Sequence, residues 1–249
     1  MITDSFDTET RPLLTLKDFY GEQRYFADIC LVTFSKVIYE TLLTTYPCKK
    51  VADMQSPNGD TPIYSFQYEG HEILFYLSLV GSTGASHCVM EANWLTGATK
   101  FVMFGSSGSL VQETTANRFV IPTEAYRDEG TSYHYASPAD YIVVKNSSVV
   151  SAILKELHIP FVEGRIWTTD AIMRETVGNA AKRRAEGCIA VDMEIAGVQS
   201  VCDFHGLELY AFVVTGDVLS EDSYTIGTLS DANHNVDKLQ IALEIAVRI

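Results

Sequence analysis

Two carboxylates lie inside the apolar run 187–197, where Asp192 and Glu194 stand two residues apart. Ionised groups are rarely buried unless hydrogen-bond donors pair with them, and the hydroxyls of a substrate can supply such donors. A second interpretation is structural: Asp192 caps the helix that follows, and Glu194 is favoured by the dipole of that helix. If the segment is extended, both side chains point to one face, whereas in a helix they diverge by about 200°.

Two short glycine segments, 81–84 and 105–108, each carry two hydroxyl residues between their glycines. Glycines allow backbone N–H groups to turn toward an anion, and hydroxyls add donors, so Gly105 and Ser106 are candidate anion ligands. Neither segment is a Walker A loop or a dinucleotide-binding fingerprint. The alternative interpretation of each is an ordinary tight turn.

Asp217 follows the strongly apolar segment 207–214 after a glycine that permits a sharp turn. A carboxyl group there can protonate a leaving group if its pKa is raised. The alternative role is that of a turn or helix-capping residue. The sequence contains no evident Ser/His/Asp triad, HExxH motif or nucleophilic cysteine pattern.

Alternating strands and helices must position these residues, which predicts an α/β protein with a central mixed, mostly parallel sheet flanked by helices. The polar clusters follow predicted strands, and sites in such sheets gather at the carboxyl ends of the strands. We therefore expect one shared site. The predicted strands are 27–33, 63–68, 72–79, 100–104, 119–122, 161–167 and 207–214, and the main helices are 35–46, 149–157, 174–186 and 231–247.

Length and composition limit the function classes. The 249 residues contain no long linker, which predicts a single domain over 1–249. The net charge of −14 argues against nucleic acid as a partner. No run of about 18 apolar residues and no signal peptide is seen, so we expect no membrane association and a cytoplasmic protein. The five cysteines predict free thiols in a reducing compartment and no metal site.

Several segments resemble one family, the nucleoside phosphorylases that include bacterial-type purine nucleoside phosphorylase and uridine phosphorylase. The methylthioadenosine nucleosidases share its fold. The segment 191–194 is similar to the Val-Glu-Met-Glu signature, and 104–110 to the Gly-Ser/Thr-x-Gly loop for phosphate and ribose. The segments 127–135 and 167–171 resemble uridine phosphorylase-like members, and 215–217 resembles the Ser-Asp of the purine enzymes. The resemblance runs from about residue 60 to the end of the chain and implies a three-layer fold.

The resemblance implies a sugar and phosphate site. Glu194 would accept hydrogen bonds from the sugar hydroxyls, and Met193 would pack against the sugar. Ser106, with Gly105, would contact phosphate and ribose.

The resemblance also implies a base site. Ile172 falls where the family often has a stacking phenylalanine, so it would give apolar contact alone. Asp217 would protonate or hydrogen-bond N7 of a leaving purine. The sugar would pass through an oxocarbenium-like state.

The sequence departs from the family at the phosphate ligands. The segment 31–36 lacks the Gly-Asp-Pro-x-Arg pattern, Met103 replaces an arginine, and no arginine lies near Gly59. The first histidine is His71, so the usual N-terminal histidine is missing. A phosphate would depend on backbone N–H groups, on Ser106 and on either Lys36 or Arg127.

Three hypotheses follow, in order of preference. The first is a phosphorylase that cleaves a purine nucleoside with inorganic phosphate as co-substrate and no other cofactor. The second is a nucleosidase that uses water, since the arginines are missing. The third is a non-catalytic nucleoside-binding protein. The family resemblance also implies a homo-oligomer, either a dimer or a hexamer.

Overall fold

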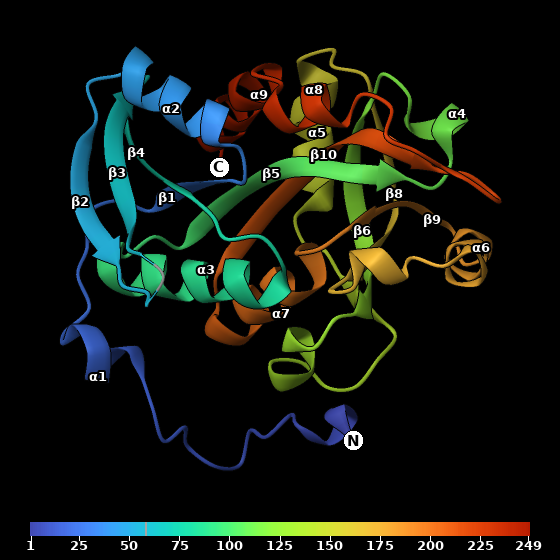
Figure 1. The fold of residues 1–249 in the computed structure, drawn as a ribbon. Helices are drawn as coiled ribbons and strands as arrows, with labels where there is room; N and C mark the ends of the chain where they lie inside the picture. The colour runs from blue at the N-terminus through green and yellow to red at the C-terminus, as the bar shows by residue number, and fades with distance from the viewer. Residues whose placement is uncertain (58) are drawn as a thin grey trace.

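A mixed β-sheet forms the centre of the protein, between layers of helices (Figure 1). The computed structural model describes residues 1–57 and 59–249. The first strand is buried along its whole length, as expected for a strand covered on both faces. In chain order the strands are β1 (Ile29–Thr33), β2 (Lys49–Met54), β3 (Thr61–Tyr68), β4 (His71–Leu77), β5 (Lys100–Ser109), β6 (Phe119–Asp128), β7 (Tyr141–Val143), β8 (Phe161–Thr169), β9 (Cys188–Asp192), β10 (Glu208–Leu219) and β11 (Tyr224–Thr225).

The strand order is β11-β10-β6-β8-β9-β5-β1-β4-β3-β2, with β7 beside β6. The neighbours β4, β1, β5 and β10 are parallel, as are β6, β8 and β9. Antiparallel pairs lie at the margins, in the β2–β3–β4 meander and at β11, and where the two parallel groups meet. The predicted α/β fold with a mixed central sheet is therefore confirmed.

Five strands close into a ring, because β5 pairs both with β10 and with β9. β10 also pairs with β6, and β6 connects through β8 to β9. At one end of the ring, Gly108 of β5 lies opposite Val191 of β9 and Asp217 of β10. The ring thus brings the ends of three strands that are distant in sequence to one place.

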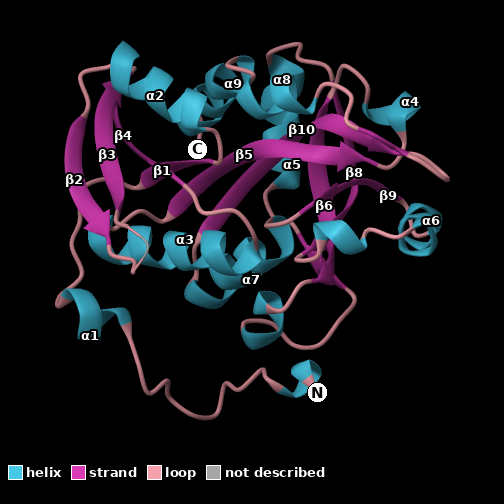
Figure 2. Ribbon diagram, in the orientation of Figure 1, coloured by secondary structure: helices cyan, strands magenta, loops and turns pink. Residues whose placement is uncertain are grey.

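Helices cover both faces of the sheet (Figure 2). Apolar side chains of α3 and α7 pack on one face, and those of α2, α5 and α9 pack on the other. No helix within the described residues combines the length and the hydropathy that a bilayer span requires. The helices are η1 (Ile2–Asp4), α1 (Leu16–Tyr20), α2 (Lys36–Thr45), α3 (Ser82–Thr96), α4 (Gln112–Thr115), η2 (Thr131–His134), α5 (Ser147–Glu156), η3 (Ile172–Arg174), α6 (Val177–Ala185), α7 (Ile195–His205), α8 (Leu229–His234) and α9 (Asp237–Ala246).

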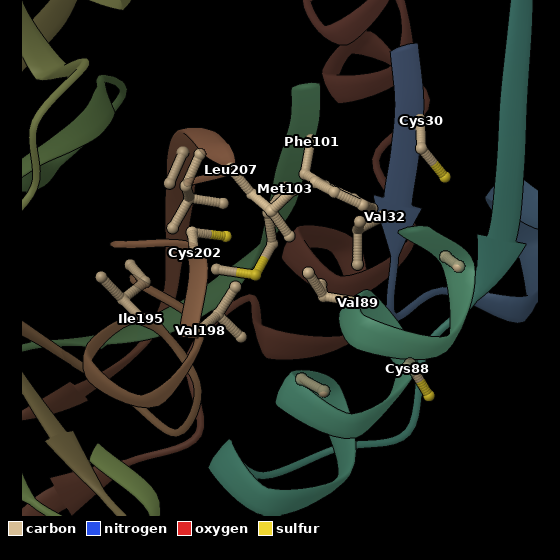
Figure 3. Close-up of a cluster of buried hydrophobic side chains, with 14 of the residues drawn as sticks. Cys30, Val32, Cys88, Val89, Phe101, Met103, Ile195, Val198, Cys202 and Leu207 are labelled. Atoms are coloured by element: carbon tan, nitrogen blue, oxygen red, sulfur yellow. The ribbon is translucent and has the colours of Figure 1, made fainter. Parts of the chain in front are cut away.

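A cluster of apolar side chains anchors α7 to the sheet (Figure 3). Val32 and Met103 from the strands meet Val89 of α3 and Val198 of α7 in this cluster. Ile195, the first residue of α7, belongs to it and is 1% exposed. Full burial of an aliphatic side chain contributes roughly 1.5–3 kcal/mol. The cluster therefore fixes where α7 begins, directly after the carboxylate pair.

The structure corrects the predicted ends of two strands. The strand predicted to end at Phe104 continues to Ser109, so the segment 105–108 is not a loop but pairs with β10. Likewise β10 continues through Gly216 to Leu219, with a bulge between Thr215 and Asp217. A Cβ atom on Gly216 would lie 2.7 Å from the Cβ of Ala232. Glycine at this position allows the close approach of α8, which a local turn pattern does not reveal.

Two predicted helices also differ. The helix predicted over 231–247 is divided into α8 and α9, and α8 packs against β5 and β10. The helix predicted from Arg174 begins instead at Val177, after the short turn η3. The predicted helix over 35–46 and the predicted hairpin at 63–79 are confirmed as α2 and as β3–β4.

Candidate active site

A cavity of about 670 Å³ opens at the end of the strand ring. The ends of β5, β9 and β10 form its floor, and η3 and α8 supply further walls. Convergence of several strand ends is the usual position of a site in an open α/β sheet. All but one of the predicted site residues line the cavity. The predicted residues that line it are Gly105, Ser106, Ile172, Met193, Glu194 and Asp217.

Glu194 lies at the junction of β9 and α7, as the N-cap residue of α7. Its Oε1 accepts a hydrogen bond of 2.7 Å from the backbone N–H of Gly81. Gly81 has a φ of 91°, a conformation that glycine adopts readily, and it caps the start of α3. Burial and, secondarily, the charge of Asp192 raise the pKa of Glu194. Glu194 thus presents an anchored carboxyl group to the cavity.

Asp192 has a different role from Glu194, although both line the cavity. Its Oδ2 accepts hydrogen bonds from the N–H groups of Glu194 at 2.9 Å and Ile195 at 2.8 Å. Its Oδ1 accepts the hydroxyl of Thr168 at 2.6 Å, and that hydroxyl also accepts the N–H of Ala196. Asp192 therefore caps the first turn of α7, as the structural interpretation of the sequence proposed. Burial raises its pKa.

Asp192→Ala is expected to lower the free energy of unfolding by about 2 kcal/mol, since it removes a helix cap and leaves buried N–H groups without an acceptor. Urea unfolding of both proteins measures the change. Asp222→Ala is the matched control, because Asp222 is exposed, and it should leave the urea midpoint unchanged. An Asp192→Ala midpoint equal to that of the unsubstituted protein would contradict the capping role.

A second pair of carboxyl groups, those of Asp217 and Glu175, also lines the cavity. Asp217 follows the bulge in β10 and is 9% exposed. Burial raises its pKa, and the hydroxyl of Tyr224 opposes that shift. Glu175 follows η3, and burial together with the charge of Asp217 raises its pKa to about 7. Glu175 can therefore hold a proton near neutral pH, and Asp217 keeps its proton to a higher pH than a solvent-exposed aspartate, which favours a role as a leaving-group acid.

The wall near Ser106 is neutral. The hydroxyl of Ser106 donates to the side-chain oxygen of Asn233 in α8. The hydroxyl of Ser35, which caps α2 at the end of β1, lies 2.9 Å from Nδ1 of His234. No lysine or arginine of the described chain is among the residues that line the cavity. A dianion at this wall would lack the charged donors that usually hold phosphate.

Lys238 fixes α8 in this position without reaching the cavity. Its ammonium group donates to the carbonyl oxygen of Ala232, and to that of Asn233 at 3.3 Å. The residue is 1% exposed, and burial lowers its pKa to about 8. A cation near the carboxyl end of a helix is favoured by the helix dipole. Lys238 therefore holds the end of α8 that carries Asn233 and His234.

Comparison with known proteins gives the family. The sequence profile of the phosphorylase superfamily matches residues 28–248. The chain belongs to the phosphorylase superfamily. The match includes all strands of the sheet and every residue of the cavity described above.

Curated superfamily members are distant from this chain in sequence. A DeoD-type purine nucleoside phosphorylase of Exiguobacterium sibiricum is 22% identical over 188 residues, which cover 73% of this chain and 78% of the relative. A guanosine phosphorylase of Halorubrum lacusprofundi is 24% identical over 206 residues, 80% of this chain and 82% of the relative.

Solved structures of the superfamily share the fold. A 5′-methylthioadenosine/S-adenosyl homocysteine nucleosidase of Campylobacter jejuni superposes with a TM-score of 0.72 at 19% identity, covering 90% of this chain and all of that one. A futalosine hydrolase mutant of Helicobacter pylori gives 0.71 at 16% identity, with the same coverage. The superfamily fold predicted from the sequence motifs is thus confirmed.

Arg127 is the one predicted site residue that does not line the cavity of this protein. Its guanidinium group donates to the hydroxyl of Ser132 at 2.8 Å and to the carbonyl oxygens of Ser137 and Ala136. The residue is 3% exposed. Because its donors hold the loop after β6, Arg127 is not positioned to bind a phosphate in the cavity.

The sequence provided no prediction for several polar residues of the cavity, among them Glu175, Asn233 and His234. Glu175 was expected in the first turn of a helix, where an acid is favoured by the dipole without any function. Asn233 and His234 were expected within a long amphipathic helix. Asn233 and His234 are polar and lie where the predicted helix divides into α8 and α9. Local periodicity does not distinguish such polar residues from those on the solvent-exposed face of one continuous helix.

Proposed function

We propose that this protein is a nucleosidase, which cleaves the N-glycosidic bond of a purine nucleoside with water. The observation that carries the proposal is the charge of the cavity. Its lining contains the carboxyl groups of Asp192, Glu194, Glu175 and Asp217, and no lysine or arginine of the described chain. Water needs no cationic ligand, whereas a phosphate dianion would be repelled by these carboxylates. The proposal takes the second of the hypotheses that the sequence supports.

Glu194 and Asp217 would supply most of the catalysis. As the bond between C1′ and the base breaks, positive charge develops on the sugar, and an ionised Glu194 would stabilise it while accepting a sugar hydroxyl. Asp217 would give its proton to N7 of the departing purine. Ile172 and Met193 would give apolar contacts to the base and to the sugar.

The wall formed by Ser106, Asn233 and His234 would hold the attacking water. When Nδ1–H of His234 donates to Ser35, Nε2 is free to accept a proton from that water. The new C1′–O bond then forms as the C1′–N bond breaks. Asp217 regains a proton and His234 releases one to solvent, which completes the balance.

Release of base should be independent of phosphate, and this is the test of the proposal. Purified protein is incubated with adenosine in phosphate-free buffer and in phosphate buffer, and base and sugar are measured by chromatography. We expect equal rates and free ribose in both buffers. In H₂¹⁸O, the label should appear at C1 of the ribose.

Phosphorolysis is the second candidate, and the names of the curated relatives favour it, since both are phosphorylases. Base release that requires phosphate and gives ribose 1-phosphate would establish it and overturn the nucleosidase proposal. Binding of nucleoside without release of base in either buffer would indicate the non-catalytic alternative.

A further inference from the structure

Arg184 is a half-buried residue whose hydrogen bonds join three elements at the end of the strand ring. It lies in the last turn of α6. Its Nε donates to the carbonyl oxygen of Leu110 at 3.1 Å, directly after β5. Its Nη2 donates to the carbonyl oxygen of Leu219 at 3.2 Å, at the end of β10, and to that of Ser220. One guanidinium group thus connects α6 to the ends of β5 and β10.

The same face of α6 also forms part of the cavity wall. Val177, Ala180 and Arg184 are spaced by three and four residues, so they share one face of the helix. Val177 and Ala180 line the cavity. Ala180 also belongs to an apolar cluster with Leu110 and Leu219. Arg184 therefore binds the backbone of the same two strand ends against which α6 packs.

The carboxyl group of Asp217 lies close to these strand ends. Asp217 stands two residues before Leu219, follows the bulge in β10 and lies opposite Gly108 of β5. A Cβ atom on Gly108 would lie 3.5 Å from Oδ1 of Asp217 and 2.7 Å from Cδ1 of Leu219. Because a bulge locally disrupts the hydrogen-bond ladder, contacts beyond it have to hold this part of β10 against β5. Arg184 supplies such contacts.

A guanidinium group is suited to this position for a geometric reason. Its donors form a rigid planar fork, which can bind carbonyl oxygens of two strands at once. None of the ion pairs found among residues 1–57 and 59–249 includes Arg184. A positive charge in the last turn of α6 is also favoured by the helix dipole. Lysine would supply that charge equally well, but it would not supply the fork.

We propose that Arg184 is a positioning residue of the active site, which places the Asp217 carboxyl group by joining the ends of β5 and β10 to α6. The inference rests on the proposed function, since it takes Asp217 as the leaving-group acid. Arg184 itself contacts no substrate and transfers no proton. Its effect on catalysis passes through the position that it gives to Asp217.

Arg184→Ala is expected to lower kcat for adenosine cleavage by about 10²-fold, the effect of misplacing a catalytic group by about 1 Å. KM should change little, because a general acid acts mainly in the transition state. Arg184→Lys should recover little of the loss, since an ammonium group keeps the charge without the fork. The matched control is Lys182→Ala, which removes an exposed cation from the same helix and should leave kcat unchanged.

The Asp217→Asn variant separates positioning from a general loss of structure. If Arg184 acts through Asp217, adding Arg184→Ala to Asp217→Asn should cause little further loss of kcat, because residues that act as one unit have non-additive effects. A further loss as large as that in the otherwise unsubstituted protein would overturn the inference. Full kcat in either Arg184→Ala or Arg184→Lys would also overturn it.

Amide hydrogen exchange measures the placement of the strand end without any reaction. In Arg184→Ala, the amides of residues 217–220 should exchange about tenfold faster, the factor expected when hydrogen bonds of this kind are lost. Those of β3, at the far side of the sheet, should not change. Unchanged exchange at 217–220 would overturn the inference, even if hydrolysis independent of phosphate has been established.

Failure of the proposed function gives a different result. If cleavage requires phosphate, the nucleosidase proposal fails, and the kcat pattern of the Arg184 variants still decides the inference. If the unsubstituted protein cleaves no nucleoside, the exchange measurement decides by itself whether Arg184 places the strand end that carries Asp217.

Discussion

Glu194→Gln is expected to lower kcat/KM for nucleoside cleavage by about 10²–10³-fold, the loss typical when a preorganised electrostatic contact to a transition state is removed. The carboxyl group is held by the N–H of Gly81 and faces the cavity, so its charge is positioned before substrate arrives. Glutamine keeps the shape and loses the charge. Steady-state kinetics of base release measures the effect.

In Glu194→Gln, the free energy of unfolding should stay equal or rise although the activity falls. Because the pKa of Glu194 is raised in the folded protein, its ionised form costs stability at pH values above the pKa of the unfolded chain. Glu194→Gln should therefore unfold at an equal or higher urea concentration at neutral pH. A fall in both stability and activity would indicate misfolding instead of a lost charge.

Glu91→Gln is a matched control for Glu194→Gln. Glu91 is another buried glutamate, 4% exposed in α3, and it accepts a hydrogen bond from Tyr20 outside the cavity. Its substitution should leave kcat/KM unchanged. Full activity of Glu194→Gln would show that Glu194 does not contact the sugar.

Asp217→Asn is expected to lower kcat by about 10²–10⁴-fold, the usual contribution of a general acid. Asparagine can donate a hydrogen bond to N7 but cannot transfer a proton. Since burial raises the pKa of Asp217, the protonated form persists to higher pH than usual. Activity of the unsubstituted protein should then decline as the pH rises through that pKa, and the decline should be absent in Asp217→Asn.

A 7-methylated purine nucleoside provides the control for this prediction. Its base already carries a positive charge at N7 and leaves without receiving a proton. Asp217→Asn should therefore cleave it at a rate close to that of the unsubstituted protein. An equal loss on the methylated and the ordinary nucleoside would mean that Asp217 is not the leaving-group acid.

Local patterns in the sequence predicted the elements that carry the site. The apolar segments predicted where β5, β8 and β10 lie in the chain, although β5 and β10 extend past their predicted ends, and the Asp192–Glu194 spacing marked two candidate site acids beside a predicted helix. Periodicity and capping depend on neighbours a few residues away, so these features can be read without a tertiary structure.

The roles within the site depend on contacts that span the chain. Glu194 is anchored by Gly81, 113 residues away, Ser106 by Asn233, 127 residues away, and Ser35 lies beside His234, 199 residues away. Such pairs leave no local pattern. The same is true of Arg127, whose donors are taken by nearby carbonyl oxygens that only the folded loop brings within reach.

The pair Asp192 and Glu194 shows which features of the site follow from the sequence and which follow only from the tertiary structure. Sequence alone determined that two acids stand two residues apart in an apolar run and that a helix follows them, because residue type and spacing decide both. Only the tertiary structure decided that the Asp192 carboxyl group accepts hydrogen bonds from the N–H groups of Glu194 and Ile195 while the Glu194 carboxyl group faces the cavity. The reason is that packing of α7 against the sheet fixes the helix start. This start brings the N–H groups of Glu194 and Ile195 to the Asp192 carboxyl group and leaves the Glu194 carboxyl group beside Gly81 at the cavity.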